Sequence, residues 1–365
     1  MERGRFGASK IATDGHGGRC PCGTGHSICP SRTKQREQGM TWQTPGWWYK
    51  KPGILAHLLA PASALWALAS INRRFPDGAY DAQAHLILIG NATAGGSGKT
   101  PTAMAVASLL EEYQPCFLSK GYGGKLQGPH WVDSEGDPSM VGDEALLLAA
   151  QAPTLIAKDR VAGAMEAARK HDLVILDDGL QHHDSLRGGS VLLVVDARDG
   201  FGNGRLIPAG PLRETPKEAL AKAHGVVLVG EGEAPHEVTS SGLPVFRAKR
   251  TFVAAGLPLR HVSVFAFCGI ARPKRFFKAL EDLGAKLVAR HAFADHQPIP
   301  TKMVRRMADD ARKARALLIT TEKDMVRLDR QVRSFAYPLI MRLQFEDPEL
   351  VKNWLSARIA RNSNS

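Results

Sequence analysis

The chain has 365 residues and a formal net charge of +12, and its composition is ordinary for a folded protein. This length allows two domains with full cores, and the charge favours nucleic acid, an anionic membrane or an anionic substrate as partner. No zinc finger, RNP motif or basic zipper occurs, so we expect no nucleic acid and favour a membrane surface or an anionic substrate.

Residues 1–40 are rich in Gly, Arg, Ser and Thr and lack apolar periodicity, which predicts a disordered extension. They lack the apolar core of a signal peptide. Because plausible structure follows directly after Met40, we interpret residues 1–39 as an upstream extension from a misplaced start codon. The chain has five cysteines, and this odd number without a disulfide-like pattern favours a reducing compartment.

The segment 54–71 is the most apolar of the chain and predicts one helix, preceded by aromatic residues and flanked by basic pairs. Such a helix spans about 27 Å, which barely reaches the thickness of the hydrocarbon layer. We favour a helix lying in the membrane surface; a spanning helix and a buried core helix are the alternatives. Its apolar stripe, with His57 and Ser63 on the other side, consists of Leu55, Leu58, Leu59, Ala62, Leu65, Trp66 and Ala69.

The run HLILIGNATAGGSGKT at 85–100 predicts a buried strand followed by a Gly-rich loop, and a helix is expected over 101–113. This arrangement indicates a P-loop, in which Lys99 reaches the outer phosphates and the Thr100 hydroxyl holds Mg²⁺. Thr93 stands where the usual pattern has its first glycine, and a tight turn that contains Gly-Lys-Thr is the alternative. The predicted nucleotide-binding residues are Thr93, Ala94, Gly95, Gly96, Ser97, Gly98, Lys99 and Thr100.

Acidic residues follow further predicted elements. A strand over 172–176 ends in Asp177 and Asp178, an arrangement in which a carboxylate contacts Mg²⁺ directly or through water, unless it is only a solvated turn. Asp143 and Glu144 precede a helix expected over 145–151, where acids suit the helix dipole whether or not they have another role.

Two further loops follow predicted strands at their carboxyl ends, where ligands of open α/β sheets bind. The strand 116–119 leads into Lys120-Gly121-Tyr122-Gly123-Gly124. The strand 191–196 leads into the long polar loop 200–214, which ends in Arg213 and Glu214 and whose length indicates a functional or mobile segment.

Strands and helices alternate over about 84–250 and again from Val262, which predicts an α/β fold: a P-loop, doubly wound parallel sheet domain, a second, smaller α/β domain and an N-terminal membrane-associated helix. The second domain is expected to have strands at 264–268, 286–289 and 316–320, helices at 273–283 and 301–313, and a loop at 291–300. A strand and a helix follow from Tyr337. The predicted divisions are 1–40, 41–75, 76–250 and 251–365.

The ordered blocks GNATAGGSGKTP, SKGYGG, VGDE, LDDGLQH, GNGRLIPAGPLRE, FCGIARPKRFF, FADHQ and TTEKD resemble the tetraacyldisaccharide 4'-kinases, the lipid A 4'-kinases of Gram-negative bacteria. The resemblance extends from about Gly46 to Trp354. The chain differs from the family at Lys120 and Gly124, where arginines are usual, and at Gln297, where a second His is frequent.

The resemblance implies a peripheral or monotopic enzyme, favoured as a monomer, on the cytoplasmic face of the inner membrane. It implies that ATP, with Mg²⁺, phosphorylates the 4'-hydroxyl of an acylated disaccharide 1-phosphate lipid in lipid A biosynthesis. It also implies two α/β/α domains joined by a two-stranded linker.

Roles for single residues follow from the same resemblance. Asp143 assists deprotonation of the sugar hydroxyl, and His296, across the cleft, tunes it. The remaining implied catalytic residues are Lys99, Asp177 and Asp178, which contact phosphate, Mg²⁺ or acceptor, and Arg213 and Glu214, which act at the phosphate and the metal. The implied metal ligands are Thr100, Asp177 and Glu214.

Two rival functions remain at this point. A P-loop ATPase or GTPase that acts through partners would share the Gly-rich loop. A GTPase also needs an N-K-x-D motif, and residues 321–324 do not have that spacing. A small-molecule kinase or ligase of the dethiobiotin-synthetase type would also share it. The apolar segment 54–71 argues against that second rival.

Overall fold

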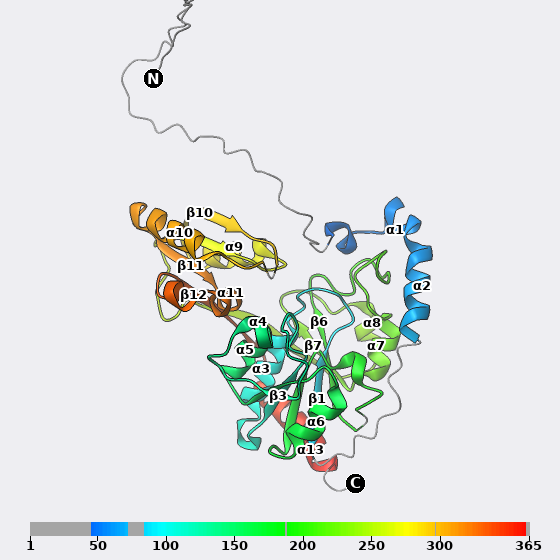
Figure 1. Cartoon of the computed structure of the whole chain (residues 1–365). Coiled ribbons are helices and arrows are strands. Elements are labelled where there is room, and N and C mark those ends of the chain that lie inside the picture. The colour runs from blue at the N-terminus through cyan, green and yellow to red at the C-terminus, as the bar shows by residue number, and fades with distance from the viewer. Residues whose placement is uncertain (1–44, 72–83, 187, 296, 363–365) are drawn as a thin grey trace, which may run out of the picture. The chain divides into compact units, whose positions relative to one another are not determined.

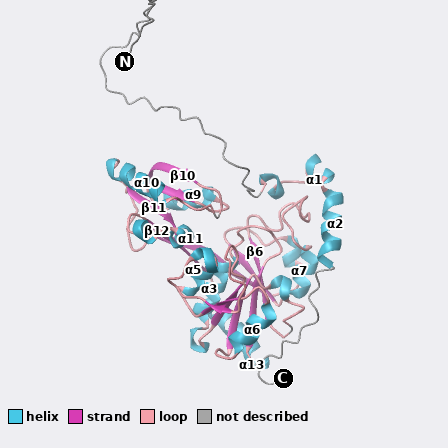
Figure 2. Ribbon diagram, viewed as in Figure 1, coloured by secondary structure: helices cyan, strands magenta, loops and turns pink. Residues whose placement is uncertain are grey.

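The computed structural model describes residues 45–71, 84–186, 188–295 and 297–362, and these residues form one sheet with helices packed against it (Figures 1 and 2). In chain order the strands are β1 His85–Gly90, β2 Cys116–Ser119, β3 His130–Trp131, β4 Thr154–Ile156, β5 Leu173–Asp177, β6 Ser190–Asp196, β7 Gly225–Val229, β8 Val245–Val253, β9 Ser263–Cys268, β10 Lys286–Ala292, β11 Leu317–Thr321 and β12 Tyr337–Phe345. Their order across the 12-stranded sheet is β10-β9-β11-β12-β8-β7-β6-β1-β5-β2-β4-β3.

The sheet has two parallel parts that run in opposite directions. The N-terminal part, residues 84–253, contains the parallel strands β8, β7, β6, β1, β5, β2 and β4, in this order across the sheet. β3 pairs antiparallel with β4 at the edge. The C-terminal part, residues 254–345, contains the parallel strands β12, β11, β9 and β10. One antiparallel pair, β8 with β12, joins the two parts. The parallel α/β fold is confirmed; the division into separate domains stays a prediction.

β1 lies at the centre of the N-terminal part, and every one of its residues is buried. Leu86 and Leu88 belong to the core on one face of the sheet, and Ile87 and Ile89 belong to the core on the other. An apolar run without alternation is what a strand covered on both faces requires. The prediction of a buried strand is therefore confirmed.

Most predicted helices occur, with shifted ends. The helix expected over 101–113 begins two residues earlier, and its last residues form the separate 3₁₀ turn η2. The helix expected over 301–313 is confirmed with these bounds. The helices are α1 Ile54–Leu58, α2 Ala60–Ile71, α3 Lys99–Leu109, α4 Pro138–Val141, α5 Asp143–Ala149, α6 Arg160–Ala168, α7 Pro216–Lys222, α8 His236–Thr239, α9 Pro273–Asp282, α10 Thr301–Lys313, α11 Glu322–Arg327, α12 Arg330–Arg333 and α13 Pro348–Asn362, with the 3₁₀ turns η1 Gly46–Tyr49, η2 Glu111–Tyr113 and η3 Leu180–His182.

The expectation of one helix over 54–71 is wrong, because the segment forms α1 and α2, separated at Leu59. Pro61 explains the break: it has no N–H to donate to the carbonyl of His57, and its ring crowds that carbonyl. Proline is tolerated in the first turn of α2, so a new helix starts there. Within the residues that the structure describes, no helix has both the length and the apolar character that crossing a membrane requires.

The end of the chain returns to the N-terminal part. β12 and α13 confirm the strand and helix expected after Tyr337, and Val351 and Leu355 of α13 belong to the same core as Ile87. The predicted extension 1–40 and the catalytic candidate His296 lie outside the described residues.

Candidate active site

The carboxyl ends of β1 and β5 meet, because Ile89 of β1 pairs in register with Asp177 of β5. β1 leads through the loop 91–98 into α3. Gly98 closes this loop with a φ of 105°, a left-handed conformation that favours glycine, and α3 begins at the next residue. The positive end of a helix therefore follows the loop directly, which is the geometry of a phosphate-binding loop.

Lys99 points back to the residues at the strand ends. Its Nζ atom donates a hydrogen bond to Asn91 Oδ1 over 2.9 Å and lies 3.3 Å from Asp178 Oδ1. Asn91 also donates to the backbone oxygen of Thr93 over 2.7 Å and to its hydroxyl over 2.9 Å. The threonine at the first-glycine position is thus fixed through its own hydroxyl by a side chain that the sequence analysis missed.

Thr100 and Asp177 contact each other directly. The Thr100 hydroxyl donates to Asp177 Oδ2 over 2.7 Å. Asp177 is buried, and its Oδ1 atom has no hydrogen-bond partner. Burial, reinforced by the negative charge of Glu144, raises the pKa of Asp177 to about 7.

This donor set fits Mg²⁺. The ion prefers oxygen ligands and is usually held by one or two carboxylates together with substrate phosphates, and Asp177 offers an unsatisfied buried oxygen beside the hydroxyl of Thr100. Among the described residues, no cluster of three or more His, Cys, Asp or Glu side chains could hold a metal ion without such phosphates.

Asp178 has different partners from its neighbour Asp177. Arg213 binds it with two hydrogen bonds, from Nη1 to Oδ2 over 3.1 Å and from Nη2 to Oδ1 over 2.8 Å. Burial raises the pKa of Asp178, but Lys99 and Arg213 outweigh it and hold that pKa well below its usual range. The two adjacent carboxyl groups therefore differ in proton affinity, which is how neighbouring acids take different roles.

Glu214 does not join the Thr100–Asp177 pair in the structure. Its carboxylate accepts hydrogen bonds from Lys222 Nζ over 2.6 Å and from Gln181 Nε2 over 2.9 Å. Gln181 also donates to the backbone oxygen of Asn91 over 3.3 Å. Glu214 is thus linked to the P-loop through Gln181, a residue in the LDDGLQH block to which the sequence analysis gave no role.

Asp143 begins α5 and is buried, with its Oδ2 atom 3.5 Å from Nε of Arg327. Glu144, next to it, lies 3.3 Å from Lys323 Nζ. Both cations lie on α11 in the C-terminal part. The predicted pairing of Asp143 with His296 falls outside the described residues. Lys323 belongs to the TTEKD block, in which the resemblance gave no residue a role, and Arg327 lies three residues after that block.

The loop 200–214 has contacts at both the P-loop and the N-terminal helices. Arg213 at its end reaches Asn91 Oδ1 over 2.6 Å, while its middle binds the N-terminal helices. Ser63 of α2 donates to the backbone oxygen of Leu206 over 2.8 Å and accepts from the N–H of Ala209 over 3.1 Å. The loop therefore connects α2 with the site.

Glycine is required at position 124, where this chain departs from the family it resembles. A Cβ atom there would lie 2.5 Å from the backbone oxygen of Met140 in α4. No side chain fits this close approach, so the position cannot supply a charged group.

A second group of ion pairs joins the two parts of the sheet at the end of β6. Asp196 pairs with Arg250 over 2.7 Å and with Arg275 of α9 over 2.8 Å. Asp199 lies 2.7 Å from Arg275 and also pairs with Arg272. The contact between the two parts therefore does not depend on α5 and α11 alone.

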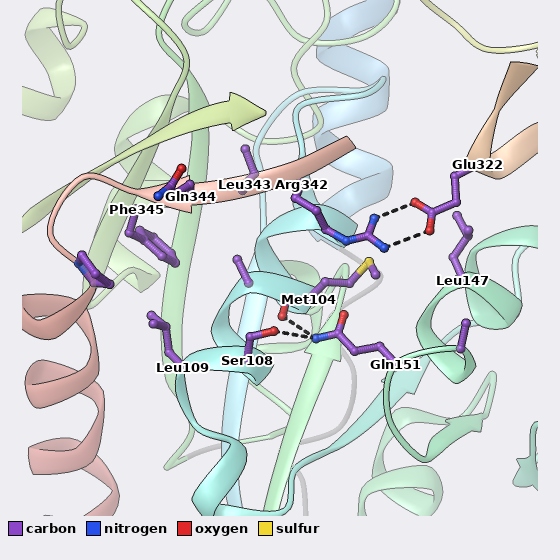
Figure 3. Close-up of a pocket in the computed structure, with 13 residues that line it drawn as sticks. Met104, Ser108, Leu109, Leu147, Gln151, Glu322, Arg342, Leu343, Gln344 and Phe345 are labelled. Carbon is purple, nitrogen blue, oxygen red and sulfur yellow. Dashed lines mark hydrogen bonds and ion pairs between the residues drawn. The ribbon is translucent and has the colours of Figure 1, made fainter. Parts of the chain in front are cut away.

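A cavity of about 660 Å³ lies between α3, α5 and β12 (Figure 3). Arg342 and Glu322 form a bidentate ion pair in its wall, and Gln151 donates to Ser108 and to the backbone of Met104. None of the predicted site residues lines this cavity. The chemistry is thus expected at the ends of β1 and β5 rather than here.

The chain is similar to known proteins along most of its length. A family model described as LpxK, tetraacyldisaccharide-1-P 4'-kinase, matches residues 55–360. The chain is 40% identical to the tetraacyldisaccharide 4'-kinase of Rhodospirillum centenum, over 86% of this chain and 96% of that protein. It is 42% identical to the one of a Methylorubrum extorquens strain, over 87% and 99%. The crystal structure of LpxK from Aquifex aeolicus in complex with ATP is similar with a TM-score of 0.64 and 27% identity, over 84% of this chain and all (100%) of that one. The chain belongs to the tetraacyldisaccharide 4'-kinase family.

Proposed function

We propose that this protein is an ATP-dependent lipid kinase that phosphorylates the 4'-hydroxyl of tetraacyldisaccharide 1-phosphate. The observation that carries the proposal is the meeting of the P-loop with two acids of unlike proton affinity. Thr100 contacts Asp177, and Lys99 contacts Asp178, where β1 and β5 end. This is the equipment for phosphoryl transfer, which depends on positioning and on neutralising charge.

Each group then has a role in the transfer. Lys99 and the N–H groups of residues 93–100 hold the β- and γ-phosphates, while Thr100 and Asp177 hold Mg²⁺, with Glu214 as a further proposed ligand. Mg²⁺ supplies positive charge that neutralises the phosphate oxygens. Arg213 acts at the phosphates, and its contact with Asp178 keeps both side chains in place.

Asp143 accepts the proton of the 4'-hydroxyl while the hydroxyl oxygen bonds to the γ-phosphorus. ADP leaves with the electron pair of the broken P–O bond. His296 orients and tunes that carboxylate. The site binds an acylated disaccharide phosphate, whose negative charge suits a chain with a net charge of +12.

We propose that α1 and α2 seat the enzyme on the cytoplasmic face of the inner membrane. The polar Ser63 faces the protein, and the leucines face outward, the reverse of a helix that covers a protein core. The large apolar residues of α1 and α2 that are half exposed or more are Ile54, Leu55, Leu58, Leu65 and Leu68.

The test is an assay of the detergent-purified protein with Mg-ATP and tetraacyldisaccharide 1-phosphate, read by mass spectrometry. The expected result is a gain of one phosphate on the lipid, which Lys99→Ala abolishes. The matched control is Lys313→Ala, which removes an exposed lysine of α10 and leaves the activity unchanged.

Hydrolysis of ATP without phosphorylation of the lipid would contradict the proposal. It would favour the second candidate function, a P-loop ATPase that acts through partners.

A further inference from the structure

Two successive acids of the N-terminal part meet two cations of the C-terminal part. Asp143 Oδ2 lies 3.5 Å from Arg327 Nε, and Glu144 Oε1 lies 3.3 Å from Lys323 Nζ. Lys323 and Arg327 are four residues apart on α11, so they share one face of that helix. Only the Arg327 pair is largely withdrawn from solvent, with 6% of the Arg327 side chain and 11% of the Asp143 side chain exposed.

Anchors within the C-terminal part hold the Arg327 guanidinium in one orientation. Its Nη2 atom donates to the backbone oxygen of Gly269 over 2.8 Å and contacts Asp324. Asp324 is itself fully buried and fixed by the Thr321 hydroxyl over 2.6 Å and by the N–H of Gly269 over 3.0 Å. These contacts hold the Nη2 side of the planar group within the C-terminal part, and the Nε atom therefore faces α5.

Nε of Arg327 has no hydrogen-bond partner, although it is buried. Its 3.5 Å distance from Asp143 is slightly longer than a hydrogen bond. Contacts of catalytic groups are often long without substrate and shorten in the substrate complex.

Asp143 also needs a nearby cation for electrostatic reasons. Glu144 follows it directly, and the Glu144 charge reaches Asp177. The charge of a buried carboxylate is stabilised by a cation beside it. Arginine keeps its charge when buried, so Arg327 is suited to this task.

We propose that Arg327 is a positioning residue for Asp143, whose carboxylate it orients toward the acceptor hydroxyl. This inference rests on the proposed function. Arg327 transfers no proton and touches no phosphate; it acts through the Asp143 carboxylate, and its contact with that group shortens to a hydrogen bond when substrates bind.

The test compares Arg327→Met and Arg327→Lys in the lipid kinase assay. We expect Arg327→Met to lower kcat by about 10-fold or more with the KM for ATP nearly unchanged, and Arg327→Lys to lose less because it keeps the charge.

The control is Arg342→Met, which removes the ion pair between β12 and Glu322 of the same helix α11 without touching Asp143 (Figure 3). We expect its kcat and its KM for ATP to match those of the unmodified protein. An equal loss of kcat in Arg342→Met and Arg327→Met would mean that α11 only docks the two parts, and it would overturn the inference.

A double-mutant cycle with Asp143→Asn separates action through Asp143 from a merely structural role. Arg327→Lys should lower kcat by less than about 2-fold once Asp143 is already replaced, and additive losses overturn the inference. Arg327→Lys alone decides the matter if Arg327→Met does not fold. Normal lipid kinase activity in both Arg327 variants overturns only this inference, whereas an inactive unmodified protein overturns the proposed function as well.

Discussion

Thr100 donates its hydroxyl hydrogen to Asp177 across 2.7 Å, which joins the start of α3 to the end of β5. The pair leaves the second oxygen of Asp177 buried and unsatisfied. A buried carboxyl group in this state holds its proton up to a pH of about 7, the value to which burial and the charge of Glu144 raise the pKa of Asp177. A divalent cation bound there must displace that proton.

Binding of Mg²⁺ is therefore expected to depend on pH. Below the raised pKa of about 7, Asp177 is protonated and cannot act as a ligand, so the affinity falls as the pH falls. Between pH 8 and pH 6 the apparent affinity should drop about 10-fold, since most Asp177 groups carry a proton at the lower value. Titration of Mg²⁺ by calorimetry with bound ATP measures this change.

The control for that experiment is Asp177→Asn, in which only protonation of the bound ATP makes the Mg²⁺ affinity depend on pH. Its affinity for Mg²⁺ should be low and nearly independent of pH beyond that contribution. An unmodified protein whose Mg²⁺ affinity is the same at pH 6 and pH 8 would show that Asp177 is not a ligand.

The same carboxyl group predicts how stability changes with pH. The pKa of Asp177 is raised from 3.8 to about 7, so the folded state keeps a proton that the unfolded state has lost. This proton stabilises the folded state. The stabilisation is complete below pH 3.8, is lost as the pH rises through about 7, and corresponds to roughly 4 kcal/mol at most.

Asp177→Asn removes the cost of ionising a buried carboxyl group at high pH, because the amide of asparagine does not ionise. We expect the variant to be inactive as a kinase and yet to have a higher Tm than the unmodified protein at pH 8. The Tm difference, measured by calorimetry without Mg²⁺, should shrink at pH 5. A variant that is less stable at pH 8 would contradict the raised pKa of Asp177.

Local patterns in the sequence sufficed for the centre of the fold. The uninterrupted apolar residues 86–89 predict a strand covered on both faces, and Lys99 and Thr100 after a Gly-rich loop predict the phosphate site. The break at Leu59 could also have been predicted, because Pro61 removes a helical hydrogen bond. The apolar stripe instead favoured one continuous helix.

Contacts between distant segments could not be predicted in the same way. β8 joins the two parts through its pairing with β12, and nothing in the residues of either strand specifies that partner. Asn91 is a single polar residue after a strand, and only the structure connects it with Lys99, Thr93 and Arg213. Such residues gain their meaning from tertiary packing.

Asp143 and Lys99 are expected to differ in what their loss impairs. Lys99→Ala should weaken ATP binding and abolish turnover, since Lys99 is proposed to bind the phosphates. Asp143→Ala should lower kcat by about 100-fold or more and leave the Kd for ATP largely intact, because a general base acts on the acceptor. Equilibrium binding of ATP and single-turnover kinetics separate the two effects. An Asp143→Ala protein with normal turnover would remove Asp143 from the base role.

The outward face of α1 and α2 gives a test of membrane binding that leaves the site untouched. Leu58 and Leu65 are 72% and 68% exposed, so Leu58→Glu and Leu65→Glu should change the free energy of unfolding by less than about 0.5 kcal/mol. Each leucine buried in a membrane contributes about 1.5 to 3 kcal/mol, so each variant should bind vesicles at least about 10-fold more weakly in a sedimentation assay. Met165→Glu is the matched control, because Met165 is an apolar residue of α6 that is 51% exposed and lies outside this face. Equal vesicle binding by all three variants and the unmodified protein would place the membrane contact elsewhere, whereas a loss confined to the leucine variants would assign it to α1 and α2.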